Sequence, residues 1–393
     1  MLRLAITLGL LGLVGPLAID MYLPALPLIA ADLGATEAQV QSTLTAYFLT
    51  FGIGQLAYGP LSDQTGRRLP ILLGLVIFLA GSLGAAMADS IASLSLWRAV
   101  QGLGGASLMV VTRAVIRDRY TGNEATRLMA MLMLVISVSP MLAPLAGSVA
   151  MALSGWRLVF LTLAGLALLD IVLAAILLPE TLAPEKRRPV NLGSLRRGAR
   201  VLLTDPVFMG LTLIGGFGMA SFFVFIASAS FVYTGQFGLG ATGFSLAFAV
   251  NAIGFFGASQ VASTLGQRFG IVQVTRTAVT GFFVAAVTLA ALALAGLATL
   301  PVIMTGLFLG NACLGLVIPT TMVLALDPHG EIAGLASSLG GTLQMMAGGL
   351  MIVLSGLFFD GTATPMLLAI AACACVSFTL TVLVLMRRPR AAA

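Results

Sequence analysis

Residues 59–88 read GPLSDQTGRR followed by LPILLGLVIFLAGSLGAAMA. The second part is a run of uncharged and mostly apolar residues, with the length that an α-helix needs to cross a hydrocarbon core of about 30 Å. The first part is a polar turn in which Gly59 and Gly66 flank Asp63 and precede Arg67 and Arg68. A charged turn joined directly to such a run is typical of a chain that crosses a membrane.

The rest of the chain repeats this pattern. Of its 393 residues, 59% are hydrophobic and only 9% are charged, whereas soluble domains have about 45–50% and about 25%. This composition excludes a soluble enzyme and favours an all-α integral membrane protein. Cutting the chain at its polar interruptions predicts twelve transmembrane helices, at residues 4–27, 40–61, 69–88, 91–116, 128–153, 156–178, 207–233, 242–265, 272–295, 301–326, 334–359 and 366–386.

The positive charges predict the orientation of these helices. If the N-terminus is cytoplasmic, 18 of the 20 Lys and Arg residues fall at cytoplasmic ends, leaving Arg157 outside and Arg98 within a helix. Such a bias satisfies the positive-inside rule. We therefore expect a multi-pass protein of the bacterial inner membrane with both termini in the cytoplasm. The basic net charge reflects this topology, so we expect no nucleic-acid partner.

The helices divide into two pseudo-symmetric bundles of six. We predict an N-terminal bundle at 1–182, a basic cytoplasmic linker at 183–204 and a C-terminal bundle at 205–393, with a short amphipathic helix at 194–203. The turn ending in Gly66 is echoed by GQRFG at 266–270, although Gln267 replaces Asp63 there. Two repeated bundles around a central site are typical of alternating-access transporters. The lone His329 is expected to be a solvated loop residue.

Several segments carry a resemblance to a known family. The 59–68 loop resembles the signature loop of the major facilitator superfamily. Four further regions are similar to the drug:proton antiporters of that superfamily, most nearly the Bcr/CflA type: AIDMYLPALP at 18–27, LWRAVQGLGG at 96–105 with RAVIRD at 113–118, SPMLAPLAG at 139–147, and GWRLVF at 155–160 with LPETL at 178–182. Ser139 departs from the pattern, which usually has Gly before this proline.

Three ionisable residues lie within predicted spans, where each costs about 2.5–3.5 kcal/mol to insert. Asp20 and Arg98 are each about 10 Å from the outer end of their helix, at a rise of about 1.5 Å per residue, and can share a layer of a central cavity. The resemblance implies that Asp20 is the proton site and that Arg98 shapes the cavity; a static ion pair between them is the alternative. Asp170 is a second-choice proton site or an acid in a crevice between helices.

The signature loop is expected to act as a cytoplasmic gate. We expect Gly59 and Gly66 to permit close backbone approach, Asp63 to lie near a helix N-terminus, and Arg67 to bridge to Asp118 and thereby hold the two halves together. Arg68 and Arg113 belong to the same motifs. In helix five, Pro140, Pro144 and Gly147 share one face and are expected to kink the helix and allow a neighbour to approach.

The predicted substrate cavity is apolar and adaptable. Its candidate residues are Tyr22, Tyr47, Gln55, Met109, Phe222, Phe225, Asn251 and Gln344. We expect a monomer in contact with membrane lipid that exchanges protons for small amphipathic compounds, such as bicyclomycin- or chloramphenicol-like drugs. The proton gradient is its energy source, and we expect no cofactor, metal or catalytic residue. A proton-coupled symporter for a nutrient is the main alternative; a membrane enzyme and a channel are disfavoured.

Overall fold

The structure is a computed structural model that describes residues 2–120, 122–187 and 192–386. The chain folds into two compact units, Met1–Leu192 and Gly193–Ala393. The boundary between them falls inside the basic segment 183–204. Four of the cations that we expect at cytoplasmic ends lie outside the described residues, namely Arg188, Arg387, Arg388 and Arg390. The described residues form helices and turns, without a β-strand.

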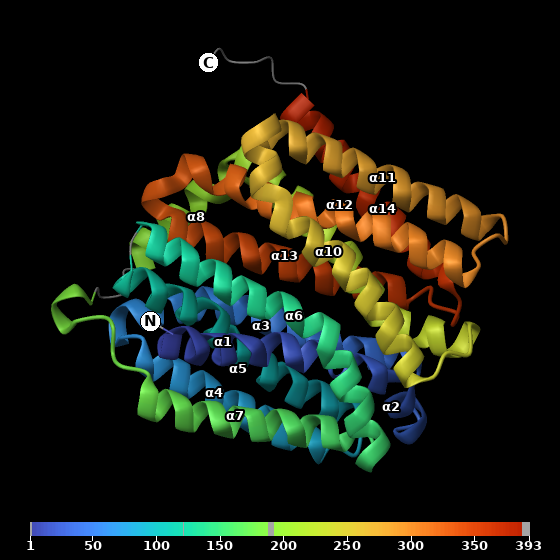
Figure 1. Ribbon diagram of the computed structural model, residues 1–393, viewed down its shortest axis with the longest axis horizontal. Helices are drawn as coiled ribbons and strands as arrows, with labels where there is room; N and C mark the ends of the chain where they lie inside the picture. Colours follow the sequence, from blue (N-terminus) through green and yellow to red (C-terminus); the bar gives the residue numbers. More distant parts are fainter. Residues whose placement is uncertain (1, 121, 188–191, 387–393) are drawn as a thin grey trace. The chain divides into compact units, whose positions relative to one another are not determined.

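The first unit is built from seven α-helices and two short 3-10 turns in its described part. They are α1 (Leu2–Asp20), η1 (Leu23–Ala25), α2 (Leu26–Asp32), α3 (Glu37–Thr65), α4 (Arg68–Ala86), α5 (Ile91–Arg119), α6 (Gly122–Ser154), α7 (Arg157–Leu177) and η2 (Pro184–Lys186). α5 packs on α3 and α4, α7 lies alongside α4, and α6 packs on α1 (Figure 1).

The second unit opens with the short amphipathic helix predicted in the linker. Its elements are α8 (Leu192–Thr204), α9 (Pro206–Phe231), η3 (Val232–Gln236), α10 (Ala241–Phe269), α11 (Ile271–Leu294), α12 (Leu300–Leu326), η4 (Asp327–Ile332), α13 (Ala333–Gly356), α14 (Ala363–Thr381) and η5 (Val382–Met386). α9 packs on α13 and α14, while α12 lies between α10 and α11 (Figure 1).

Every predicted span corresponds to a long helix in the described residues. By length and composition, eleven of these helices are apolar enough to cross a membrane. The remaining long helix, α3, has 29 residues and includes buried polar side chains such as Gln41, Thr43 and Gln55. None of its membrane-length stretches is as apolar as those of the eleven. The protein is therefore a multi-pass membrane protein of the all-α class.

The repeated glycine turns have the same backbone geometry in both units. Gly66 lies between α3 and α4 with φ of 96°, and Gly270 lies between α10 and α11 with φ of 83°. Left-handed φ values favour glycine over any residue that carries a Cβ atom. The two copies differ in their surroundings, because a Cβ atom at Gly66 would meet Glu180 whereas one at Gly270 would meet nothing within 4 Å.

The first predicted span is not one continuous helix, as we expected, but is broken after Asp20. α1 ends at Asp20, and the chain continues through the turn at Met21 and Tyr22 into η1 and then α2. Pro24 and Pro27 each start one of these short elements, at the first or second position. Proline lacks a backbone N–H and fits only the first turn of a helix. The break therefore places Asp20 at a helix C-terminus.

One end of the first unit is fastened by the cation that topology places outside the cytoplasm. The Arg157 guanidinium donates to Asp32 Oδ2 at 2.9 Å and to the carbonyl of Ala88 at 3.1 Å. Trp156 Nε1 donates to the same Asp32 oxygen at 2.9 Å, and its ring lies 4.2 Å from the Arg157 guanidinium carbon. This staple joins the end of α2, the turn after α4 and the start of α7.

His329 is not the solvated residue that we expected. Its side chain is only 12% exposed, and Nε2 lies 3.0 Å from Asp205 Oδ2. The imidazole also packs edge-on against Phe208. Asp205 is the N-cap of α9 and accepts from the Val207 amide. Burial acts to raise the pKa of Asp205, but these hydrogen bonds outweigh it and hold the pKa below its usual range.

Candidate functional site

Arg98 occupies an aromatic cage at the centre of the first unit. Its side chain is fully buried, and its guanidinium carbon lies 4.6 Å from the Tyr22 ring centroid, 4.4 Å from Tyr47 and 5.9 Å from Phe160. Desolvated cation–π contacts of this kind contribute about 2 kcal/mol or more. Three helices and one turn meet at the cage, because Arg98 is on α5, Tyr47 on α3, Phe160 on α7 and Tyr22 in the break after α1.

The guanidinium has only part of its hydrogen-bonding capacity filled. Arg98 Nη1 donates to the carbonyl of Ala18 at 3.0 Å and to Gln101 Oε1 at 2.5 Å. Gln101 in turn donates to Ser82 on α4. Among the described residues, Arg98 Nε and Nη2 are buried without a partner. A buried donor left unpaired costs about 1–3 kcal/mol, so Arg98 retains capacity for an anionic group.

Asp20 lies next to this cage without forming an ion pair with it. The carboxyl group is 4% exposed, and Ser139 on α6 donates to its Oδ2 at 3.5 Å. Four ion pairs are found among the described residues, and neither Asp20 nor Arg98 takes part in one. The expected alternative of a static Asp20–Arg98 pair is therefore wrong for this conformation, because Arg98 bonds instead to Ala18, two residues earlier.

The position of Asp20 disfavours its ionised form on two physical grounds. Burial removes the carboxylate from water, which penalises its charge. The C-terminal end of a helix also carries partial negative charge, and Asp20 is the last residue of α1. Against these two effects, the described residues provide only the long Ser139 hydrogen bond. Asp20 is therefore a buried acid at a helix end with a single weak hydrogen bond among the described residues.

The buried face of α6 holds the chain break in place. Pro140, Pro144 and Gly147 are all buried on this face, as the spacing predicted. A Cβ atom at Gly147 would lie 2.2 Å from the carbonyl oxygen of Met21, the residue after Asp20. Gly147 thus permits the backbone of α6 to approach the break directly.

Asp170 lies apart from the Asp20 and Arg98 side chains. It is 4% exposed and belongs to the buried stripe of α7 that also contains Ala167 and Ala174. No hydrogen bond or ion pair involving Asp170 is found within the described ranges. This placement fits the crevice interpretation, and a proton role for Asp170 stays a second-choice prediction.

The signature loop forms a second polar cluster centred on Arg67. Arg67 Nε and Nη2 donate to the two oxygens of Asp118 at 2.7 and 3.2 Å, and Nη1 donates to Asp63 Oδ1 at 2.6 Å and to Ser62 at 2.7 Å. The predicted contact between Arg67 and Asp118 is thus confirmed. Burial acts to lower the pKa of Arg67, but the two carboxylates outweigh it and raise the pKa. All these partners belong to the first unit, so this contact does not itself join the two halves as we expected.

Glu180 is a member of this cluster that our sequence reasoning did not assign a role. Its carboxylate accepts from the backbone amides of Arg67 at 2.8 Å and Arg68 at 3.2 Å, at the N-terminus of α4, and from Thr181 and Leu182. Burial acts to raise the pKa of Glu180, yet these amides hold it below its usual range. We had expected Asp63 at a helix N-terminus, but Asp63 lies in the last turn of α3.

Among the other motif residues, Gly66 has the close approach that we expected and Gly59 does not. A Cβ atom at Gly59 would meet only Val110, at 4.0 Å, so no close approach requires glycine there, whereas one at Gly66 would lie 2.4 Å from Glu180 Oε2. Arg68 donates to the carbonyl of Ala175. Arg113 Nη2 lies 3.6 Å from the sulfur of Met109, one turn earlier on α5. Met109 is therefore paired with a motif arginine.

Two predicted cavity residues of the second unit, Phe222 and Phe225, lie in an aromatic cluster of α9 and α10. Phe222 stacks on Phe255 at 5.0 Å, and Phe225 stacks on Phe248 at 5.6 Å. Asn251 is fully buried and accepts from Asn311 on α12 at 3.4 Å. Gln344 on α13 faces Gly215 and Gly216 of α9. In the first unit, Gln55 is 8% exposed, whereas Tyr22 and Tyr47 belong to the arginine cage.

These features define the class of the protein. Membrane-spanning helices in two compact units, with a buried acid and a buried arginine, are features of a secondary membrane transporter. The sequence pattern of the Major Facilitator Superfamily matches residues 8–352. The chain belongs to this superfamily, whose members are transporters rather than enzymes.

Individual proteins agree with this assignment. An uncharacterized MFS-type transporter YdgK of Bacillus subtilis is 36% identical to this chain, over 93% of this chain and 91% of the relative. A bicyclomycin resistance protein homolog of Haemophilus influenzae is 30% identical, over 94% and 92%. The crystal structure of a D-xylose-proton symporter has a TM-score of 0.78 at 15% identity, over 99% of this chain and 98% of the symporter. The symporter shows likeness of fold alone.

Proposed function

We propose that this protein is a proton-coupled antiporter that exports small amphipathic drug-like compounds from the cytoplasm by alternating access. It would act as a monomer in the bacterial inner membrane, with both termini in the cytoplasm. The observation that carries the proposal is the Asp20 site, a buried carboxyl group at a helix break with one weak hydrogen bond and no ion pair among the described residues. Intramembrane acids of this kind mark proton relays.

The exchange of a proton for a substrate requires the two forms of Asp20 to be stabilised in different states. In the conformation described, burial favours the neutral acid. Among the described residues, the Arg98 nitrogens Nε and Nη2 have no hydrogen-bond partner, and Nη1 bonds to Ala18, two residues before Asp20. A small change at the break could therefore bring the carboxylate to Arg98 and favour its ionised form. The Ala18 bond and the Ser139 bond would exchange with this pair as the proton leaves.

The chemistry of the substrate is inferred from side chains and from a relative. Phe222 and Phe225 provide apolar aromatic surface, and Asn251 and Gln344 add uncharged polar groups. Such surfaces suit amphipathic molecules better than sugars or organic anions, which need more polar or cationic contacts. The name of the Haemophilus influenzae relative, a bicyclomycin resistance protein homolog, supports drug export. The symporter fold likeness, at 15% identity, does not favour nutrient uptake.

The orientation is supported by the exposed cations. Arg196, Arg197 and Arg200 are exposed on α8, where a basic amphipathic helix can lie on an anionic leaflet. Arg157, which the topology places outside, is instead held by Asp32. Exposed cations on α8 and an ion-paired Arg157 agree with the positive-inside rule.

Two experiments test this function. A susceptibility panel that includes bicyclomycin and chloramphenicol, in an efflux-deficient host expressing the chain, identifies an exported compound. Everted vesicles with an imposed pH difference then measure its uphill accumulation for the wild type, Asp20→Asn and Asp170→Asn. We expect Asp20→Asn to abolish accumulation while binding persists, because an amide keeps the shape of the acid but cannot release a proton. Accumulation by Asp20→Asn at the wild-type level would refute the assignment, and loss in Asp170→Asn alone would move it to Asp170.

A further inference from the structure

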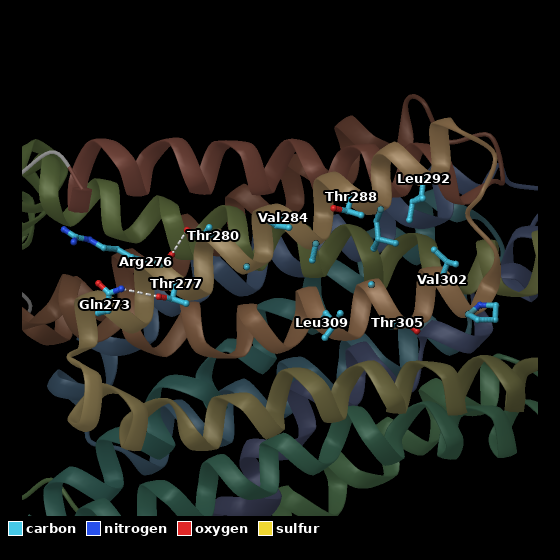
Figure 2. Close-up of a pocket in the computed structure, with 15 residues that line it drawn as sticks. Gln273, Arg276, Thr277, Thr280, Val284, Thr288, Leu292, Val302, Thr305 and Leu309 are labelled. Carbon is cyan, nitrogen blue, oxygen red and sulfur yellow. Dashed lines mark hydrogen bonds between the residues drawn. The ribbon is translucent and has the colours of Figure 1, made fainter.

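A long groove lies between α11 and α12 of the second unit, away from the residues assigned above. Its volume is about 1110 Å³. Figure 2 shows the lining residues in sequence along α11, with Gln273 and Arg276 at one end and Leu292 near Val302 of α12 at the other. From Arg276 to Leu292 the groove runs about 24 Å at a rise of about 1.5 Å per residue, close to the thickness of a hydrocarbon core of about 30 Å.

The walls of the groove suit a hydrocarbon chain. Val284, Ala285, Leu292 and Leu309 line it. Threonines also line it, but the Thr280 hydroxyl already donates to the Arg276 carbonyl at 2.8 Å within α11. Gly281 and Gly306 also contribute to the lining and add no side chain that would fill the groove. A ligand in the groove therefore meets mainly apolar surface and methyl groups.

Only one described lining residue is charged, and it stands at one end. Arg276 donates from Nη2 to the carbonyl of Leu385, near the end of the described chain. It takes part in none of the four ion pairs among the described residues, and no acid lines the groove. Figure 2 shows the guanidinium extending beyond the end of the groove. Arginine pairs with phosphate through several N–H groups, and Arg276 has no carboxylate partner in the part of the chain that the structure describes.

We infer that this groove binds an anionic phospholipid, with its phosphate at Arg276 and an acyl chain along α11. The topology proposed above places Arg276 on the cytoplasmic side, where anionic lipids are concentrated, and basic pockets between membrane helices on that side bind lipid head groups. A cationic drug is disfavoured as occupant because Arg276 would repel its charge. The groove is a lipid site separate from the proton and substrate residues.

The test measures lipid retention, so it does not depend on transport. The full-length protein is purified in mild detergent, incubated with phosphatidylglycerol or with phosphatidylcholine, and examined by native mass spectrometry. Arg276→Gln removes the charge, and Arg268→Gln is its control, because Arg268 is an exposed arginine outside the groove. Ala285→Phe fills the groove, and Ala291→Phe is its control, because Ala291 is an exposed alanine on the same helix that does not line it.

We expect the wild type to retain phosphatidylglycerol in preference to phosphatidylcholine. Arg276→Gln should lower this retention about fivefold, the effect of one cation near an anionic lipid surface. Ala285→Phe should lower retention of both lipids, and the two controls should match the wild type. Equal retention by all variants would overturn the inference. If only Ala285→Phe lowers retention, the groove does not recognise the head group, and the inference is overturned. If the wild type is a dimer and Ala285→Phe is not, the occupant is a second copy of the chain, which also overturns the inference.

Discussion

Gly147→Ala tests the close approach between α6 and the break after Asp20. The added Cβ atom would lie 2.2 Å from the Met21 carbonyl oxygen and 2.9 Å from its carbonyl carbon, whereas carbon and oxygen normally approach to about 3.3 Å. The backbone of α6 or of the break must therefore shift by about 1 Å. Because a backbone carbonyl cannot rotate away as a side chain does, we expect the overpacking cost of about 1–3 kcal/mol.

Gly165→Ala is the matched control. Gly165 is also within a membrane helix, α7, and a Cβ atom there would meet nothing within 4 Å. Both variants gain the same helix propensity of about 1 kcal/mol for alanine over glycine, so this gain cancels when they are compared. At about 2–4 °C per kcal/mol for units of 150–250 residues, Gly147→Ala should melt about 2–12 °C below Gly165→Ala.

The assay is thermal unfolding in detergent, followed by transport in vesicles at a temperature where both variants are folded. We expect Gly147→Ala to lose active export as well as stability, since the displaced Met21 adjoins Asp20, while Gly165→Ala keeps both. Equal melting temperatures and equal transport would refute the close approach. Lost stability with normal export would separate packing at the break from coupling at Asp20.

Three further predictions concern charged residues in the turns. Asp118→Asn should lower the melting temperature more than Asp63→Asn, because Asp118 is 17% exposed and binds two guanidinium nitrogens, whereas Asp63 is 60% exposed and binds one; similar losses would contradict this. Glu180→Gln should cost about 0.3–1 kcal/mol in thermal unfolding, the range for an exposed charge at a helix N-terminus, and Glu185→Gln should cost nothing measurable. Because the pKa of Asp205 is held low, its contribution to stability is present above about pH 4, near the pKa of an unfolded aspartate, and is lost as the pH falls further. Melting temperatures measured from pH 6 to 3 should therefore converge for the wild type and Asp205→Asn, and a constant difference would argue against the linkage.

The sequence predicted the helices well because membrane insertion depends on the apolar content of each segment. α3 shows the limit of this rule, since cutting the chain at its polar interruptions predicted it although no membrane-length stretch of it is as apolar as those of the other spans. The break after Asp20 was missed because Tyr22, Leu23 and Ala25 are as apolar as the helix before them. Pro24 and Pro27 were the available signal, and we assigned them to the end of a continuous span.

The candidate site was only partly predictable. Asp20 and Arg98 were predicted to share a layer of the cavity, whereas Tyr22 and Tyr47 were predicted only as substrate contacts. The packing of α3, α5 and the break after α1 shows that the two tyrosines enclose the arginine. Glu180 lies 113 residues from Arg67 in the chain. A single sequence does not show that two residues so far apart in the chain are in contact in the fold. The LPETL segment was recognised as a motif, but that its Glu180 caps the N-terminus of α4 is seen only in the structure.

The staple of Asp32, Trp156 and Arg157 gives the protein a built-in optical probe. The chain has two tryptophans, so replacing Trp97 with phenylalanine leaves Trp156 as the single indole. That ring lies against a guanidinium and donates to a carboxylate, and its emission depends on both contacts. Separation of α2 from α7 would therefore change the fluorescence of an unlabelled protein, and stopped-flow records after a pH jump would time this motion directly.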